Sequence, residues 1–167
     1  MSHLLLSSVK KVSVLYAGFF VLEGFDFGVG ILLPFLGTND KKRRQIINTI
    51  GPVWDGNEVW MLTAGGAMFA SFPHVYATLF SGFYLAFILL LFTLVFRGVS
   101  IHVRSLRPET PWRSFWDGAF SVSSLLAALL IGVALGNVAW GVPLEPNFRY
   151  QGDLLAQIHP YTVLTGI

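Results

Sequence analysis

The sequence predicts an all-α, polytopic membrane protein: a bundle of four transmembrane helices followed by the start of a fifth. Hydrophobic residues make up 54% of the chain and charged residues only 12%, and the mean hydropathy is +0.64. A soluble domain of this size would need more polar surface. The 167 residues give room for about four spans of roughly 20 apolar residues each. The apolar residues also fall into long runs separated by short polar segments.

The first predicted span covers residues 12–35, and the second covers residues 45–72. At about 1.5 Å per residue the first would extend about 36 Å, which is enough to cross a bilayer with some tilt. Lys10 and Lys11 precede it, as basic residues precede the apolar part of a signal peptide. No small-residue cleavage site follows them, so we interpret the segment as a retained helix.

The third predicted span, residues 75–96, contains no charged residue and is the clearest of the four. The sequence SFPH at residues 71–74 separates it from the second span. The fourth span covers residues 115–140, with Trp116 and Trp140 near its two ends. Tryptophan is enriched where a helix meets the lipid headgroups, so both residues fit the role of interfacial anchors.

The chain after the fourth span is polar to about residue 153 and then becomes apolar again. We therefore predict one four-helix transmembrane bundle over residues 1–154. The start of a further, truncated helix would follow over residues 155–167.

Basic residues predict which side of the membrane each loop faces. Those in the loops after the first and third spans are Lys41, Lys42, Arg43, Arg44, Arg97, Arg104, Arg107 and Arg113. The opposite side would hold Lys10, Lys11 and Arg149. Because cytoplasmic loops are enriched in Lys and Arg, we expect the two basic loops in the cytoplasm and the N-terminus outside. A chance distribution over the loops is the alternative.

Two acidic residues interrupt the first predicted span. Glu23 and Asp26 are three residues apart, so they share one face of a helix. A charged side chain at the centre of a bilayer costs about 2.5–3.5 kcal/mol on insertion scales. We expect every basic residue in a loop, a tail or at a helix end, so no cation within the bundle would offset this cost. The acids are then protonated, or line a hydrated cavity, or pair with a cation from a partner protein.

The first two of these arrangements describe a site that holds and passes protons, whereas a neutral pair that hydrogen-bonds a neighbouring helix is the alternative. On the same helix, Gly24 and Gly28 form a small-xxx-small pair. Such a pair lets another helix backbone approach closely, so we predict that both glycines lie at a helix contact.

The second span carries a further pair of acids in the sequence WDGNEVW, residues 54–60. Asp55 and Glu58 repeat the spacing of three residues. If the helix begins near residue 45 and kinks at Pro52, Asp55 lies roughly 15 Å along it. If it begins at Pro52, Asp55 lies in its first turn, near the cytoplasmic interface, where the helix dipole favours an acid. We favour the kink.

In both geometries Asp55 lies nearer the cytoplasm than Glu23 and Asp26 lie to either side, so Asp55 and Glu58 could lead inward toward the first pair. Together the four acids predict a path along which protons move inward from the cytoplasm. We expect three neighbouring residues to support the acids or to pack at helix interfaces: Trp54, Asn57 and Trp60.

Residues that could hold a metal or a haem are few and poorly placed. The chain has no cysteine, and no histidine falls in the middle of a predicted span; the histidines are His3, His74, His102 and His159. Met61 and Met68 are interpreted as packing residues rather than axial ligands. We therefore expect no metal site and no haem ligand in this chain. The net charge of +2 is too small to indicate nucleic acid binding.

Several of these motifs together resemble one protein family. The motif GFDFGVG in the first span, NDKKRR in the next loop and the block WDGNEVWMLTAGGAMFASFPHVYATLFSGFY resemble subunit II of the cytochrome bd family of quinol oxidases, including its cyanide-insensitive relatives. The resemblance extends from about Leu22 to Pro143, and the long block is specific. Glu23 is one departure from the resemblance, because it occupies a position where we expect a variable acidic or polar residue in the family. The family's subunit is also longer than this chain, which resembles its N-terminal half.

The resemblance implies a subunit of a respiratory oxidase in the bacterial cytoplasmic (inner) membrane, which takes electrons from quinol and reduces dioxygen to water. In that family two haem b groups and the haem d belong to subunit I, the expected partner. The family's subunit II has been assigned a proton pathway from the cytoplasm, in which Asp55 would be the first acid. The resemblance leaves open whether a quinone binds this chain and whether a small single-helix subunit joins the complex.

Two other classes of function remain open. Half of a proton-coupled secondary transporter would also place acids inside the membrane, where they bind substrate or a coupling ion at a repeat interface. A passive structural subunit would leave the activity intact when all four acids are neutralised, provided that the complex still forms.

Overall fold

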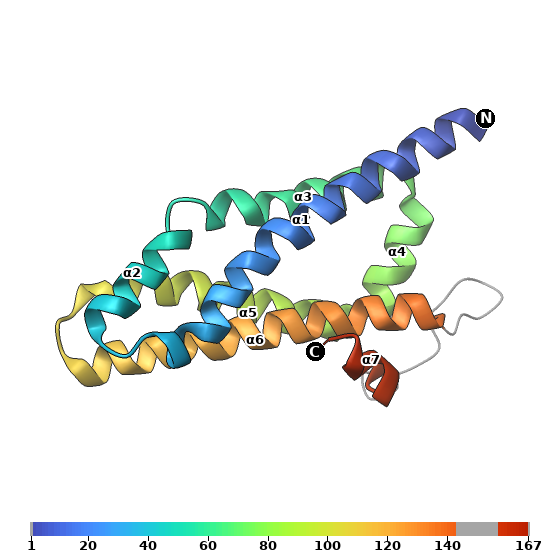
Figure 1. The fold of residues 1–167 in the computed structure, drawn as a ribbon. Coiled ribbons are helices and arrows are strands. Elements are labelled where there is room, and N and C mark those ends of the chain that lie inside the picture. Colours follow the sequence, from blue (N-terminus) through green and yellow to red (C-terminus); the bar gives the residue numbers. More distant parts are fainter. Residues whose placement is uncertain (1, 143–156, 167) are drawn as a thin grey trace.

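The computed structural model describes residues 2–142 and 157–166, and its regular structure is helical throughout this part of the chain (Figure 1). In chain order the elements are α1 (Ser2–Leu36), α2 (Asp40–Ile50), α3 (Trp54–Ser71), α4 (Pro73–Gly82), α5 (Tyr84–Val103), the 3-10 turn η1 (Arg104–Leu106), α6 (Thr110–Trp140) and α7 (Pro160–Leu164). The all-α prediction is therefore confirmed for the described residues. Arg149 and the predicted boundary at residue 154 lie outside them.

Within the described residues, three helical segments are long and apolar enough to cross a membrane: His3–Leu36, Tyr84–Leu106 and Thr110–Trp140. They correspond to α1, to α5 with η1, and to α6. Many of their large apolar side chains point outward; Val21 is 74% exposed and Leu91 is 63% exposed. Such exposure suits a lipid environment and would be costly over so wide an area in water.

The predicted second span, residues 45–72, is not one helix. α2 ends at Ile50, a turn follows, and α3 begins at Trp54. Pro52 explains the break, because it has no N–H to donate and its ring would clash with the carbonyl group four residues earlier. The expected kink at Pro52 is therefore wrong, and Figure 1 shows α2 and α3 as two helices that run in different directions. Asp55 consequently lies in the first turn of α3.

The predicted third span, residues 75–96, also has different limits. α4 ends at Gly82, and α5 begins at Tyr84 after a break at Phe83, whose φ is −99° and ψ is 22°. At its other end α5 continues to Val103, past the predicted limit, because no proline or turn sequence stops it. Arg97, which we expected in a loop, therefore lies inside a helix.

The packing of the long helices creates a crossing point in the middle of the molecule. α1 packs against both α3 and α6, while α5 packs along α6 (Figure 1). At the contact of α1 with α6, a Cβ atom on Gly30 would lie 2.0 Å from Ser124 Oγ, so only glycine permits this approach. Buried apolar residues fill the space on either side of the crossing: Phe27, Leu90, Leu94 and Ala127 on one, and Leu33, Ile47, Ile50 and Phe120 on the other.

Candidate functional site

A buried arginine and three carboxylates meet where α1, α3 and α5 converge. Arg97 Nη1 forms ion pairs with Glu23 Oε1 and, at 2.8 Å, with Glu58 Oε1. Arg97 Nη2 lies 3.7 Å from Asp26 Oδ2. The side chains of Arg97, Glu23 and Asp26 are 0% exposed, whereas that of Glu58 is 24% exposed. We call these four residues the Arg97 cluster.

The helices position each member of the Arg97 cluster. Glu23 and Asp26 point from one face of α1, as their spacing predicts, and Glu58 comes from the first turns of α3. The Arg97 guanidinium lies 5.0 Å from the ring centroid of Phe27 and 6.0 Å from that of Trp54, so two aromatic faces flank it. A Cβ atom on Gly98 would lie 2.8 Å from the Trp54 ring, so glycine at this position makes room for the indole.

The prediction that the acids of the first span lack a cationic partner within the bundle is wrong. The error came from ending the third span at Phe96, where the uncharged run stops. The helix continues, and Arg97 faces inward because three carboxylates, two of them more than 70 positions away in sequence, offset the cost of its burial. An arginine at the edge of an apolar run, in a chain with unpaired acids, is the signal that could have found it.

The Arg97 cluster contains more acids than its cation can balance. With all groups ionised, one guanidinium would face three carboxylates. Several of its atoms also have no hydrogen-bond partner within the described chain, among them Glu23 Oε2, Asp26 Oδ1 and Arg97 Nε. Because uncompensated buried charge is costly, the carboxylates in excess of the cation are the groups that would hold protons.

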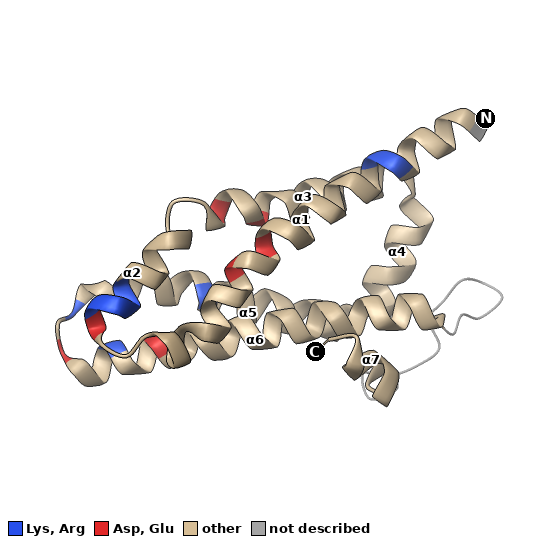
Figure 2. Ribbon diagram, in the orientation of Figure 1, with Lys and Arg blue, Asp and Glu red and all other residues tan. Residues whose placement is uncertain are grey.

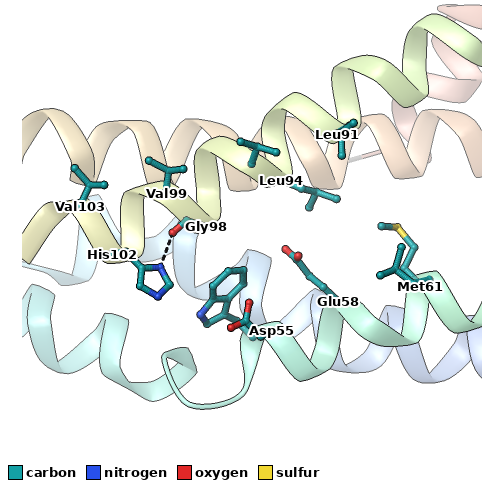
Figure 3. A pocket seen from close by; sticks show the side chains of 12 residues that line it. Asp55, Glu58, Met61, Leu91, Leu94, Gly98, Val99, His102 and Val103 are labelled. Carbon is teal, nitrogen blue, oxygen red and sulfur yellow. Dashed lines mark hydrogen bonds between the residues drawn. The ribbon is translucent and has the colours of Figure 1, made fainter.

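Asp55 and Glu58 line a groove between α3 and α5. The groove has a volume of about 550 Å³. In Figure 3 Asp55 and Glu58 lie near the middle of the view, between His102 on one side and Met61 on the other, and apolar residues such as Leu91 and Val99 also line the groove. His102 Nδ1 lies 3.0 Å from the carbonyl oxygen of Gly98 (Figure 3). Asp55 is exposed, whereas Glu58 both lines the groove and belongs to the Arg97 cluster.

The other predicted site residues fall in different surroundings. Asn57 Nδ2 donates a hydrogen bond of 2.8 Å to Asp26 Oδ2, so it contacts the cluster directly. Trp54 is buried beside Arg97. Trp60 packs on α1 where a Cβ atom on Gly18 would lie 2.6 Å from its ring.

Gly24 and Gly28 do not lie at a helix contact within the described chain. A Cβ atom on either glycine would meet nothing within 4 Å. The close approaches of α1 instead involve Gly18 and Gly30. A contact of the Gly24 and Gly28 face with another protein stays a prediction.

A second group of charges, whose pairing we did not predict, joins α2 to the hairpin of α5 and α6. Asp117 binds Arg104 and, at 3.0 Å, Arg43. Asp40 lies 2.8 Å from both Arg104 and Arg113. The hydrogen bond from Arg104, helped by the charges of the nearby arginines, holds the pKa of Asp40 below its usual value. We call these five residues the Asp117 network.

Among the residues that the structure describes, no group of three or more His, Asp or Glu side chains is arranged to hold a metal ion. Figure 2 shows acidic positions on α1 and α3 in the middle of the molecule, and further acidic positions among the basic ones that gather around α2. The site consists of ionisable side chains.

The chain is similar to one family of respiratory proteins. Residues 9–167 match the sequence profile of cytochrome bd terminal oxidase subunit II. The chain is 49% identical over 160 residues to the cytochrome bd-I ubiquinol oxidase subunit 2 of Escherichia coli. It is 43% identical over 156 residues to the cytochrome bd ubiquinol oxidase subunit 2 of Bacillus subtilis. These matches cover 93% of this chain but only 42% and 46% of the two relatives, so the chain spans less than half of their length.

Proposed function

The chain belongs to the cytochrome bd terminal oxidase subunit II family, and we propose that it works as the haem-free subunit II of a bd-type quinol oxidase. In this proposal the complex oxidises quinol and reduces dioxygen to water in the bacterial cytoplasmic membrane. Partner subunit I holds two haem b groups and the haem d. This chain supports that subunit and supplies a path for the protons that oxygen reduction consumes.

The observation that carries the proton path is the sharing of Arg97 by three carboxylates. A buried carboxylate with its own cation would stay ionised and could not release and rebind a proton easily. Three carboxylates around one cation can carry protons in several arrangements with the same total charge. A proton can therefore pass from one acid to another without leaving an unpaired charge in the membrane.

The exposure of the four acids suggests the order of the path. Asp55 is exposed at the groove and would take up protons from water. Glu58 lies between, since it lines the groove and also pairs with Arg97. Glu23 and Asp26 are fully buried and would receive the proton from Glu58. Asn57 orients Asp26 by its hydrogen bond.

The distribution of basic residues supports a cytoplasmic start for this path. With Arg97 buried, seven basic residues remain around α2, η1 and the start of α6: Lys41, Lys42, Arg43, Arg44, Arg104, Arg107 and Arg113. Lys10 and Lys11 lie toward the opposite end of α1. Because the basic end is expected in the cytoplasm, the N-terminus would face outside. Asp55 lies in the first turn of α3, directly after the short turn that follows α2 and its basic residues.

Exchange of Asp55 for asparagine tests the proposal. In the full-length complex, Asp55→Asn removes the proton-binding group but keeps the size of the side chain. We expect quinol-dependent oxygen uptake to fall at least about tenfold, because a positioned proton-transfer group typically contributes more than that. Visible spectra should show unchanged haem content.

The matched control is Glu109→Gln, which neutralises an acid in the exposed segment before α6 that forms no ion pair in the described chain. It should leave oxygen uptake unchanged. Full turnover of Asp55→Asn with intact haems would remove Asp55 from the path. If the purified chain brings no haem-bearing partner with it, the assignment as an oxidase subunit is wrong as well.

A further inference from the structure

α2 is held at the level where α1 leaves the membrane. α1 ends at Leu36 and α2 begins at Asp40, and the three intervening residues can reach only about 10 Å. Arg43 Nε also donates a hydrogen bond of 2.8 Å to the carbonyl oxygen of Gly37, which ties α2 back to this linker. On its inner side Ile47 and Ile50 are buried against α1 and α6. α2 therefore cannot move away from the membrane surface without unpacking.

The outward side of α2 is cationic. Lys41, Lys42 and Arg44 are exposed. Lys41 and Lys42 form no ion pair within the described chain, and both acids of the Asp117 network are engaged by arginines. Asp117 is held by Arg43 and Arg104, and Asp40 is held by Arg104 and Arg113. The two acids of the Asp117 network are therefore not available to pair with the exposed cations of α2.

Large apolar side chains are exposed at the ends of the spans that border this surface. Phe35 is 76% exposed and Leu36 is 56% exposed, directly before the linker to α2. Leu106 at the end of η1 and Phe115 in α6 are exposed as well. Protein surfaces bind anionic lipid through this combination of groups. Apolar side chains enter the acyl region, and neighbouring cations lie at the level of the phosphates.

We propose that Lys41, Lys42 and Arg44 form a binding surface for the phosphate groups of anionic phospholipids. The lipid supplies the negative charge that the engaged acids cannot, and its acyl chains lie against the exposed apolar residues of α1. This inference depends on α1 crossing a membrane and does not depend on the proton path.

The test uses the assembled, full-length complex in vesicles of phosphatidylcholine that contain spin-labelled phosphatidylglycerol or spin-labelled phosphatidylcholine. The motionally restricted fraction of each label reports which lipid the protein retains. The wild-type complex should prefer phosphatidylglycerol. Because one cation near an anionic surface contributes roughly a fivefold gain in binding, the variant Lys41→Gln, Lys42→Gln, Arg44→Gln should lower this preference at least about tenfold.

Lys10→Gln with Lys11→Gln is the matched control, because it removes exposed cations near the other end of α1; it should not change the preference. The variant Lys41→Arg, Lys42→Arg, Arg44→Lys keeps the charge and should behave as the wild type, which separates charge from folding. Inorganic phosphate at equal ionic strength should not displace the lipid. The proposal is overturned if the triple Gln variant keeps its preference. It is also overturned if the wild-type complex shows none, as an acidic protein segment covering α2 would cause.

Discussion

At Arg97 a single guanidinium lies against Glu23, Glu58 and Asp26 in a part of the molecule where its side chain is 0% exposed. Removing one partner from a buried ion pair leaves the other charge unpaired, and this costs about 3–5 kcal/mol. Arg97→Gln should therefore lower the free energy of unfolding of the detergent-solubilised protein by an amount in that range. Thermal unfolding measures the loss.

A compensating substitution separates charge balance from packing at this residue. If the loss in Arg97→Gln comes from unpaired carboxylates, adding Glu23→Gln should restore part of the stability, because one buried acid is then neutral. If Glu23→Gln instead adds a further loss of equal size, the residues act through shape and hydrogen bonds, and the charge argument fails.

Asp40 offers a residue-scale prediction about pH. Because the hydrogen bond from Arg104 lowers its pKa in the folded protein, the ionised form is favoured by folding. The stability that Asp40 contributes is complete above its pKa in the unfolded chain, about 3.9, and is lost as the pH falls through its lower pKa in the folded state. The difference in melting temperature between wild type and Asp40→Asn should thus be largest near neutral pH and shrink in acid.

Glu109→Gln serves as the control for this pH dependence, since Glu109 forms no ion pair in the described chain. A difference between wild type and Asp40→Asn that stays constant from neutral to acidic pH would show that the carboxylate is not stabilised by the arginines. The effect should be modest, because Asp40 is 43% exposed and water screens its ion pairs.

At the scale of elements, the contact of α3 with α5 depends on Gly98. A Cβ atom there would lie 2.8 Å from the Trp54 ring, and the ring also flanks the Arg97 guanidinium. Gly98→Ala should therefore displace Trp54 and cost about 1–3 kcal/mol of stability, as overpacking does. Gly65→Ala in α3 is the control, since nothing lies within 4 Å of the added atom. Equal stability of the two variants, measured by thermal unfolding, would contradict this account of the contact.

The sequence was sufficient to predict the elements whose apolar runs are long. α1 and α6 contain the predicted spans 12–35 and 115–140, although each helix begins earlier than predicted. The runs of apolar residues did not reveal the break at Phe83, because no proline or charged residue marks it. Pro52 was recognised as a perturbation, but whether proline bends or ends a helix depends on what the two parts pack against.

For the candidate site, the spacing of Glu23 and Asp26 predicted a shared, buried face, and both side chains are buried. The partner of these acids could not be found in the same way. Arg97 lies 74 positions from Glu23 and 39 positions from Glu58, so only the crossing of three helices brings them together. A hydropathy scale counts each arginine in a span as a cost in free energy. It does not show that acids distant in sequence can offset this cost.

At the scale of the whole molecule, the charges divide into two groups with opposite balance. The Asp117 network has two acids and three arginines, whereas the Arg97 cluster has three acids and one arginine. The first group is well paired at the basic end of the molecule and holds α2 to the hairpin of α5 and α6. The second group lies deep among apolar residues. This contrast is why we assign a structural role to the first and proton transfer to the second.

We propose that protons for oxygen reduction pass through the Arg97 cluster and that Glu58 links this cluster to the groove. The most direct test follows proton uptake and electron transfer together in the full-length complex, with Glu58→Gln compared with Glu109→Gln. We expect Glu58→Gln to slow proton uptake while the first electron still passes from quinol to the haems at the normal rate. Proton uptake at the wild-type rate in Glu58→Gln would contradict it.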